Sequence, residues 1–293
     1  MGEVPDLVVP RRTRVAEEGG LVDLGDLCIH YRRLGGPSRP AALVLHGLMA
    51  HAWQWDTLVR QLATTHDVVV PDLRGHGFSE WSADYTAEAL AGEATALLEH
   101  LDLRDVDIVA SSIGGSAGML LAARRPDLVR RLVLVESAPD AFEEGPIAER
   151  FLELLRHRAW ESFASVDEAV DRWLEADPRS KRENIFEFLR RSLVSDGDGR
   201  LIWTFDALGL AGRVGSGIEG PLLWGAIDDL VAPTLVIRGH ASEVLPRATA
   251  DQMIDRLLHP QPLVEIGGAA HDLASQAPIA VAHHCCGFLT GPD

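Results

Sequence analysis

A regular alternation of short apolar runs and amphipathic stretches between residues 41 and 135 most constrains the fold of this chain. The first run, 41–45, is continuous and wholly apolar, as is typical of a strand that is buried on both faces. The stretch 87–101 repeats its leucines and alanines at helical spacing. The predicted strands of this region are 41–45, 68–70, 106–110 and 132–135. Strands that alternate with helices at this spacing form a doubly wound, mostly parallel sheet, so the predicted fold class is α/β.

The alternation stops near residue 138 and resumes at 234. Two short strands at 21–24 and 27–31, broken by Gly25-Asp26, precede it as a hairpin, and a last strand is expected at 263–266. The intervening segment contains three helical patterns, at 146–157, 166–175 and 183–193. We therefore predict a core domain of residues 1–137 and 217–293, with a helical cap of residues 138–216 inserted after the sixth strand. Because ligands bind at the carboxyl ends of the strands in such sheets, this cap would cover the site as a lid.

The charge of the chain excludes several classes of partner. Acidic side chains number 44 against 27 basic ones, which gives a net charge of −17. This surplus argues against nucleic-acid binding and against docking on an anionic membrane surface. No apolar run resembles a signal peptide or a membrane span. The three cysteines form no disulfide framework, so a soluble, cytoplasmic protein that acts on a small molecule is expected.

The segment 106–115 carries the strongest chemical signal. A predicted strand leads into Ser112, and a helix of small residues begins directly after it. Ala110 and Gly114, two positions to either side, permit a sharp strand-to-helix turn. Such a turn holds the Ser112 hydroxyl above the sheet and directs the N–H group of Ile113 into the same space. A helix N-cap is the competing interpretation of Ser112, but its place at the strand–helix junction favours a nucleophile elbow.

A serine nucleophile requires a base and an orienting acid. His271 lies in a glycine-rich loop after the last predicted strand, and Glu243 lies in the turn after the preceding strand. The chain order serine, acid, histidine is typical of one fold. An exposed loop histidine is the alternative interpretation of His271.

With these residues in this order, the chain resembles the capped, single-domain α/β-hydrolase family over about residues 22–289. The resemblance implies Ser112 as nucleophile, His271 as general base and acid, Glu243 as orienting acid, and the backbone N–H groups of Leu48 and Ile113 as the oxyanion hole. It also covers a segment at 199–208 that resembles the return from the cap. The matching motifs are the His46-Gly47 turn with Trp53 downstream, segment 72–79, the elbow at Ser112, the acid turn at 233–239 and the histidine loop.

Two departures from the family pattern concern the elbow and the acid. Ala110 stands where members usually have glycine, and Ser111 stands where many have histidine. The acid is more often aspartate than glutamate. Some members keep their acid after the strand at 132–135, where Glu136 and Asp140 compete with Glu243.

Other polar clusters have simpler interpretations. The sequence His283-His284-Cys285-Cys286 does not predict a metal site, because adjacent helical positions point about 100° apart and cannot converge. His46 and His76 are interpreted as turn residues. Trp203 is a candidate lining residue of a substrate pocket. The glycine pairs lack dinucleotide-binding spacing, so neither a cofactor nor a metal is implied.

The predicted function is that of a cofactor-independent serine hydrolase. Its substrate would be an ester, thioester, lactone or activated C–C bond of a small, partly hydrophobic molecule, cleaved through an acyl-enzyme. The alternative is a non-hydrolytic enzyme of the same fold, such as a lyase, cyclase, decarboxylase or cofactor-free oxygenase, with His271 as the base. A binding protein on an enzyme scaffold is a third hypothesis. Epoxide hydrolysis and dehalogenation are disfavoured, because relatives with those activities use aspartate where Ser112 stands. The acidic surplus favours neutral substrates unless arginine lines the pocket.

Overall fold

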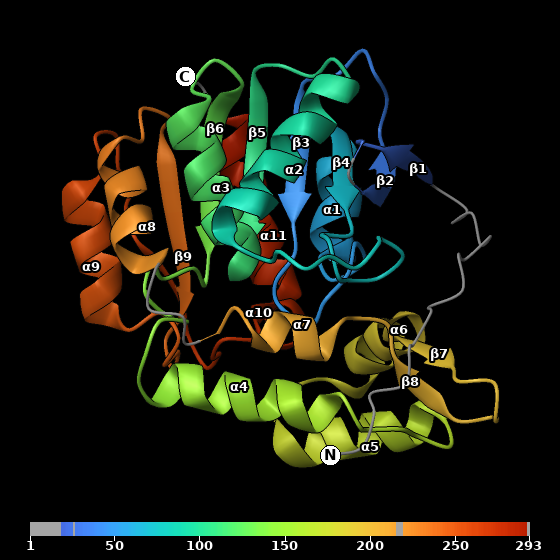
Figure 1. Ribbon diagram of the computed structural model, residues 1–293. Coiled ribbons are helices and arrows are strands. Elements are labelled where there is room, and N and C mark those ends of the chain that lie inside the picture. Colours follow the sequence, from blue (N-terminus) through green and yellow to red (C-terminus); the bar gives the residue numbers. More distant parts are fainter. Residues whose placement is uncertain (1–18, 26, 215–218, 292–293) are drawn as a thin grey trace.

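An eight-stranded, mostly parallel sheet forms the centre of the molecule (Figure 1). This computed structural model describes residues 19–25, 27–214 and 219–291. The strand order is β1-β2-β4-β3-β5-β6-β9-β10, with antiparallel pairing only at β1–β2 and β2–β4. The strands are β1 (Gly19–Asp23), β2 (Cys28–Leu34), β3 (Ala41–Leu45), β4 (Asp67–Pro71), β5 (Val106–Ser111), β6 (Val129–Val135), β9 (Thr234–Gly239) and β10 (Val264–Ile266). The predicted α/β class is confirmed, and so is the hairpin of the first two strands, although its turn includes residue 26, outside the described residues.

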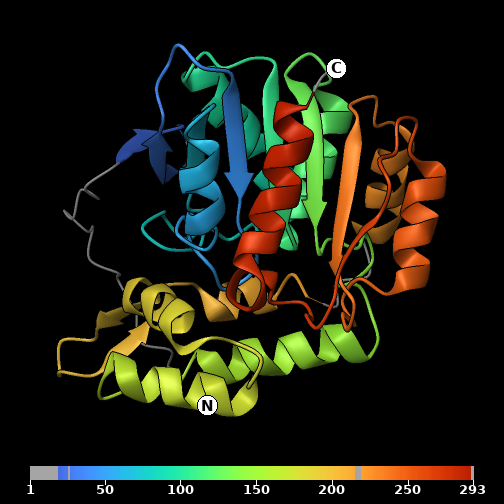
Figure 2. The ribbon, with the colours of Figure 1, turned by 180° about the vertical axis from the view of Figure 1, so that it is seen from behind.

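Helices cover both faces of the sheet (Figures 1 and 2). Alternate side chains of β3 point to opposite faces, so Leu43 and Leu45 join one apolar cluster while Ala42 and Val44 join the other. One face carries α2 (Ala87–His100), α3 (Ile113–Arg124) and α8 (Glu219–Asp228). The other carries α1 (Asp56–Leu62) and α11 (Pro278–Thr290). Helix α9 (Arg247–Arg256) packs beside α8 and β9.

A mainly helical layer lies across the carboxyl ends of the parallel strands (Figure 1). It consists of α4 (Pro146–Arg158), α5 (Val166–Ala176), α6 (Arg182–Ser192), the antiparallel pair β7 (Leu193–Ser195) and β8 (Leu201–Trp203), and α7 (Ala207–Ala211). The three predicted helices are present, and their ends differ from the predicted ones by at most one residue. The sequence predicts that the third ends at residue 193, but α6 ends at residue 192 and β7 begins at residue 193. The predicted division into 1–137, 138–216 and 217–293 stays a prediction, and its second boundary lies outside the described residues. We call this layer, residues 146–211, the cap.

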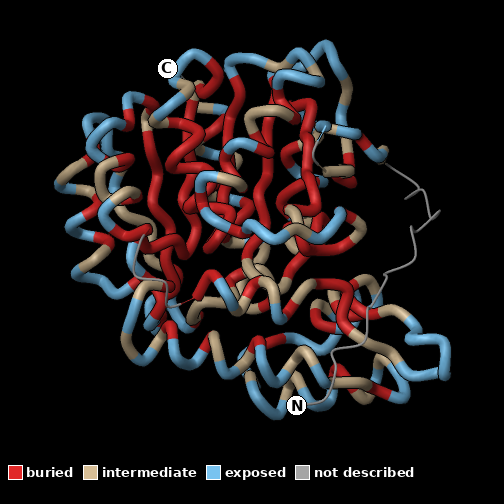
Figure 3. The backbone as a smooth tube through the Cα atoms, in the orientation of Figure 1, coloured by how far each residue is buried: buried red, intermediate tan, exposed pale blue. Residues whose placement is uncertain are grey.

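Burial differs between the sheet and the cap. The central strands are buried throughout, whereas the cap helices are exposed along one side (Figure 3). Helix α5 buries Ala169 and Val170, and α6 buries Ile185 and Leu189. An apolar stripe of this kind must pack against another element, and here α5 and α6 pack against each other. Within the described ranges, no helix has the length and apolar character needed to cross a membrane.

Candidate active site

Ser112 occupies a strained turn between β5 and α3. Its backbone has φ 52° and ψ −119°, values that a residue with a side chain rarely adopts. The turn is tight, because a Cβ atom at Gly114 would lie 2.5 Å from the carbonyl oxygen of His46. A Cβ atom at Gly115 would lie 1.9 Å from Ser137 Oγ. Gly114, one of the two small residues that predicted the elbow, is therefore required by its packing, and so is Gly115.

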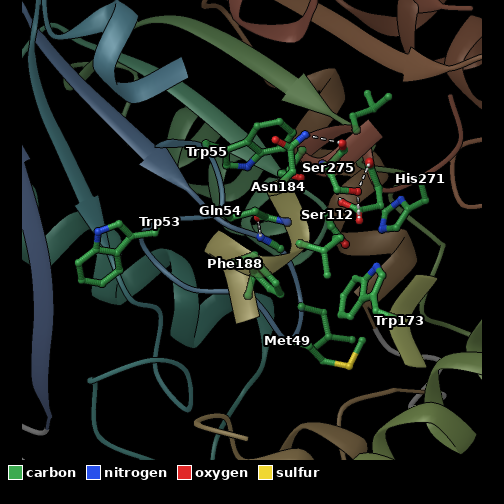
Figure 4. Close-up of a pocket in the computed structure, with 18 of the residues that line it drawn as sticks. Met49, Trp53, Gln54, Trp55, Ser112, Trp173, Asn184, Phe188, His271 and Ser275 are labelled. Carbon is green, nitrogen blue, oxygen red and sulfur yellow. Dashed lines mark hydrogen bonds between the residues drawn. The ribbon is translucent and has the colours of Figure 1, made fainter. Parts of the chain in front are cut away.

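The Ser112 hydroxyl is buried and unpaired. Its Oγ has no hydrogen-bond partner among the described residues, although the residue lines a cavity beneath the cap. His271 lines the same cavity, and the two side chains lie near each other in Figure 4. A hydrogen bond from Ser112 to His271 is not formed in this structure. Such bonds often tighten only when substrate is bound.

Two backbone N–H groups near Ser112 lack acceptors. Gly47 N–H donates to Gln54 Oε1 at 2.9 Å, and Met49 N–H donates to His76 Nε2 at 3.1 Å. Between them, the N–H group of Leu48 has no acceptor among the described residues. Ile113 is the first residue of α3, so its N–H group has no partner within the helix. The two amides expected to form an oxyanion hole are thus available for a ligand.

His271 is held by Glu136. The distance between His271 Nδ1 and Glu136 Oε2 is 3.0 Å. Because a carboxylate only accepts hydrogen bonds, Nδ1 carries the proton and Nε2 remains free. Glu136 is buried, and it also accepts hydrogen bonds from Gly239 N–H and Ser242 Oγ, each at 2.5 Å. These three donors compensate for the burial of the carboxylate.

The structure does not bring Glu243 to His271, which corrects the assignment of the orienting acid. The Glu243 side chain is 69% exposed, and its carboxylate accepts a hydrogen bond from Arg150 of α4 at 2.7 Å. Of the two competing carboxylates, Asp140 is exposed, and Glu136 is the one that reaches the imidazole.

The physical reason lies in the sheet. Strands β6 and β9 are parallel neighbours, with Val135 opposite Ile237, so the turns after both strands open at the same edge. A carboxylate from either turn is therefore placed to approach the histidine loop. Chain order does not distinguish the two turns, and Ser242, the residue before Glu243, supports the carboxylate of Glu136 instead.

The two motif histidines have structural hydrogen bonds. His46 Nε2 accepts from Leu73 N–H at 2.9 Å, and its Nδ1 lies 2.8 Å from the carbonyl oxygen of Gly47. Burial lowers the pKa of His46 to about 3 and that of His76 to about 4. Both rings are therefore neutral at pH 7, and both of their ring nitrogens are engaged. This agrees with their interpretation as turn residues.

The cavity has a volume of about 460 Å³ and lies between the cap and the elbow. Its walls are rich in aromatic side chains, and Trp203 is among them, as expected for a pocket-lining residue. The indole Nε1 of Trp203 donates to Glu161 at 3.0 Å, which fixes the ring. The other aromatic residues of this wall could not be predicted from the sequence, because helical spacing does not show which buried side chains contact a cavity. They are Trp53, Trp55, Phe151, Trp173, Phe188 and Phe205.

The loop that carries His271 is bound to the cap. Gln276 lies in the short helix α10 (Leu273–Gln276). Its Oε1 accepts a hydrogen bond from the N–H group of Ala270 at 2.7 Å. The same side chain donates to Asp177, at the end of α5, at 2.8 Å. One amide thus connects the residue before His271 to the cap.

Metal-ligating residues do not cluster in the described part of the chain. No group of three or more His, Cys, Asp or Glu side chains there is arranged to hold a metal ion. Cys285 is buried among apolar residues of α11, which packs on the sheet.

Comparison with known proteins establishes the family. Residues 40–278 match the alpha/beta hydrolase fold, so the chain belongs to the α/β-hydrolase family. The chain is similar to the esterase Rv0045c of Mycobacterium tuberculosis, with 29% identity over 262 residues that cover 87% of this chain and 84% of the relative. It is also similar to the sn-1-specific diacylglycerol lipase ABHD11 of Mus musculus, with 30% identity over 263 residues that cover 87% and 83% of the two chains.

Solved structures have the same fold. The structure of E-2-(acetamidomethylene)succinate hydrolase matches with a TM-score of 0.80 at 22% identity, over 93% of this chain and 99% of that chain. The crystal structure of the esterase Rv0045c matches with a TM-score of 0.74 at 25% identity, over 94% and 91% of the two chains. With esterases, lipases and other hydrolases among its relatives, the chain is a hydrolase enzyme.

Proposed function

We propose that this enzyme is a cofactor-independent serine hydrolase that cleaves a carboxylic ester, or a related thioester, lactone or activated C–C bond, of a small, partly hydrophobic molecule. One observation carries the proposal: a single aromatic cavity is lined both by the elbow serine Ser112 and by the imidazole of His271, which Glu136 holds. The esterases and lipases among the relatives support the ester as the principal substrate.

Acylation begins at Ser112. Its Oγ attacks the carbonyl carbon of the ester while His271 Nε2 takes the hydroxyl proton. Glu136 stabilises the imidazolium through the Nδ1–H hydrogen bond. The negative charge on the carbonyl oxygen is met by the N–H groups of Leu48 and Ile113. When the tetrahedral intermediate collapses, His271 returns the proton to the leaving alkoxide, so the products are an alcohol and an acyl-serine.

Deacylation repeats these steps with water. His271 Nε2 removes a proton from a water molecule, whose oxygen attacks the acyl carbon. Collapse of the second tetrahedral intermediate releases a carboxylic acid and returns the proton to Ser112 Oγ. The overall reaction converts one ester and one water molecule into an alcohol and a carboxylic acid, and it requires no cofactor.

A fluorophosphonate probe tests the nucleophile. We expect the probe to label Ser112, and we expect Ser112→Ala to abolish labelling. Ser195→Ala, which changes an exposed serine in the hairpin of the cap, is the control and should label fully. Absence of labelling in folded wild-type protein would refute the proposal.

Kinetics of two variants separate hydrolysis from the non-hydrolytic alternative. If Ser112 is the nucleophile, both Ser112→Ala and His271→Ala lose at least about 10³-fold in kcat, because the two groups act as a unit. If Ser112→Ala keeps most of the activity while His271→Ala loses it, the histidine acts as a base on carbon and the serine hydrolase proposal fails.

A further inference from the structure

Arg158, at the end of α4, is a cation inside the cavity. Its side chain is 17% exposed and lines the same cavity as Ser112. The guanidinium carbon lies 4.4 Å from the ring centroid of Trp203 and 5.5 Å from that of Trp173. An aromatic ring attracts the face of a guanidinium group. The N–H donors lie in the plane of the guanidinium, so this contact leaves them free to form hydrogen bonds. The two tryptophans therefore hold the group and leave its edge available.

The hydrogen bonds of Arg158 are incomplete. Its Nη1 donates to Glu161 Oε2 at 2.7 Å, but Nε and Nη2 have no acceptor among the described residues. The same carboxylate receives the indole N–H of Trp203 and lies 3.7 Å from Arg172. Glu161 is thus shared between two guanidinium groups. Burial lowers the pKa of Arg158, and this effect outweighs the opposing attraction of Glu161.

Four carboxylates line the cavity, and they belong to Asp56, Asp177, Glu187 and Asp272. Two of them are paired with arginines other than Arg158. Asp56 accepts a hydrogen bond from Arg32 at 2.8 Å. Glu187 accepts one from Arg191, the second arginine of the cavity, at 2.9 Å. Neither has a hydrogen bond or ion pair with Arg158.

The remaining two carboxylates belong to the contact between the cap and the histidine loop. Asp177 accepts hydrogen bonds from Ser180 and Gln276. Asp272 is bonded to Ser275, and its burial raises the pKa of its carboxyl group, which favours the neutral form. The other arginine of the cavity, Arg191, shares Glu187 with Arg190, and its side chain is 25% exposed against 17% for Arg158. Arg158 is consequently the more buried of the two cations that line the cavity.

Helix α4 relates this cation to the reacting groups. Phe151, Leu154 and Arg158 lie at positions i, i+3 and i+7, so one face of α4 lines the cavity. The ring of Phe151 contacts that of His271, with 6.0 Å between their centroids. From Phe151 to Arg158 the helix rises about 10 Å. The guanidinium therefore lies at the far end of an apolar wall that begins at the histidine.

We propose that Arg158 binds a carboxylate at the end of the substrate remote from the scissile carbonyl, so that the substrate class is an ester with an aliphatic spacer and a terminal carboxylate. This inference rests on the proposed function. A guanidinium with two free donors on one edge matches the planar geometry of a carboxylate. The apolar wall between His271 and Arg158 accommodates the spacer.

Graded ester pairs test the proposal. One series consists of mono-4-nitrophenyl esters of dicarboxylic acids from succinate to suberate, and its neutral partners are 4-nitrophenyl esters of monocarboxylic acids with equal carbon number. A second series carries the carboxylate on the alcohol, as butyrate esters of ω-hydroxy acids, beside butyrates of neutral alcohols. We expect a higher kcat/KM for the charged member in at least one series, with an optimum at intermediate spacer length. A preference for the neutral member at every length in both series would overturn the proposal.

Arginine variants assign this preference to Arg158. In Arg158→Met, the ratio of kcat/KM for charged and neutral esters should fall about 10- to 100-fold, as expected for a lost charged hydrogen bond. Arg158→Lys, which keeps the charge, should retain part of the ratio. The matched control is Arg172→Met, because Arg172 also approaches Glu161 but does not line the cavity, and its ratio should stay within twofold. Equal loss in both methionine variants would assign the effect to the fold of the cap and overturn the proposal.

A binding measurement separates this proposal from the hydrolase proposal. Adipate binding to Ser112→Ala is measured by calorimetry, since it requires no turnover. Binding that is lost in the Ser112→Ala/Arg158→Met double variant supports the carboxylate site even if no ester is cleaved. Equal binding, or none, in both proteins contradicts the site even if Ser112 is labelled by the fluorophosphonate.

Discussion

Glu136 combines a strained backbone with a fully paired side chain. It follows β6 directly and has φ 53°, a value that few residues with a side chain adopt. Its N–H group donates to the carbonyl oxygen of Ile237, which anchors the turn to β9. The carboxylate then reaches Gly239, Ser242 and His271 together. Strain of this kind persists only where surrounding contacts hold it, and it is common at functional sites.

The role of Glu136 can be tested against Glu243. Glu136→Gln should lower kcat by about 10³- to 10⁴-fold, because an amide cannot stabilise the imidazolium and can favour the wrong histidine tautomer. Glu243→Gln is the matched control and should change kcat by less than about twofold, since Glu243 contacts only Arg150 at the surface. Steady-state kinetics on a 4-nitrophenyl ester, with thermal unfolding to verify folding, measures both. Loss of activity in the Glu243 variant alone would show that Glu243, and not Glu136, is the orienting acid.

At the scale of elements, the elbow depends on how closely α3 approaches β5. A Cβ atom at Gly118 would lie 2.8 Å from the Cβ atom of Ala110. The departure from the family pattern at Ala110 is thus compatible with the fold because residue 118 has no side chain. Close packing of this kind brings the start of α3, and with it the N–H group of Ile113, near the end of the strand.

A pair of substitutions tests this packing. Gly118→Ala should lower the free energy of unfolding by about 1–3 kcal/mol, because it overpacks a buried contact. Adding Ala110→Gly to this variant removes the clashing methyl group and should recover part of the loss. Urea denaturation of the wild type, both single variants and the double variant provides the measurement. Additive effects of the two substitutions would contradict direct contact between these positions.

At the scale of the whole molecule, buried histidines lie near the contact between the sheet domain and the cap. His51 stacks on Phe188 of α6, with 4.7 Å between ring centroids, and its Nε2 lies 3.0 Å from Ser192 Oγ. Burial lowers the pKa of His51 and of His76 to about 4. It lowers the pKa of His46 further, to about 3. All three rings are neutral in the folded state at pH 7. Folding therefore requires that these groups release protons in acid.

Acid should destabilise the protein through these groups. Between pH 6.5 and about 4, the unfolded chain binds protons at the three histidines while the folded chain does not, so the free energy of unfolding falls as pH falls. At pH 5 the loss is about 2 kcal/mol for each histidine, relative to pH above 7. Urea denaturation from pH 7.5 to pH 5 measures it.

Two variants assign this pH dependence. His51→Gln should reduce the part of the slope that the three histidines contribute by about a third, since one of three titrating rings is removed. His157→Asn, which changes a histidine whose side chain is 73% exposed, should leave the slope unchanged. An unfolding free energy that does not change between pH 7.5 and pH 5 would contradict the prediction.

The local patterns of the sequence determined the elements and most of the candidate site. Continuous apolar runs define strands because only buried strands lack polar alternation, and small residues around Ser112 define the elbow because backbone contacts exclude side chains there. The histidine loop is recognisable in the same way, from its glycines. These features depend on residues that are neighbours in the chain, so they can be predicted from the sequence of a single protein.

Only the tertiary structure decided which carboxylate meets His271 and which side chains line the cavity. Glu136 and Glu243 follow strands that are neighbours in the sheet but far apart in the chain, and the same order of residues fits either assignment. The choice depends on where each side chain points after its turn, and Glu136 turns inward to three donors while Glu243 turns outward to Arg150. The position of Arg158 likewise depends on how α4 packs across the sheet. Such contacts join residues distant in the chain, and no local pattern encodes them.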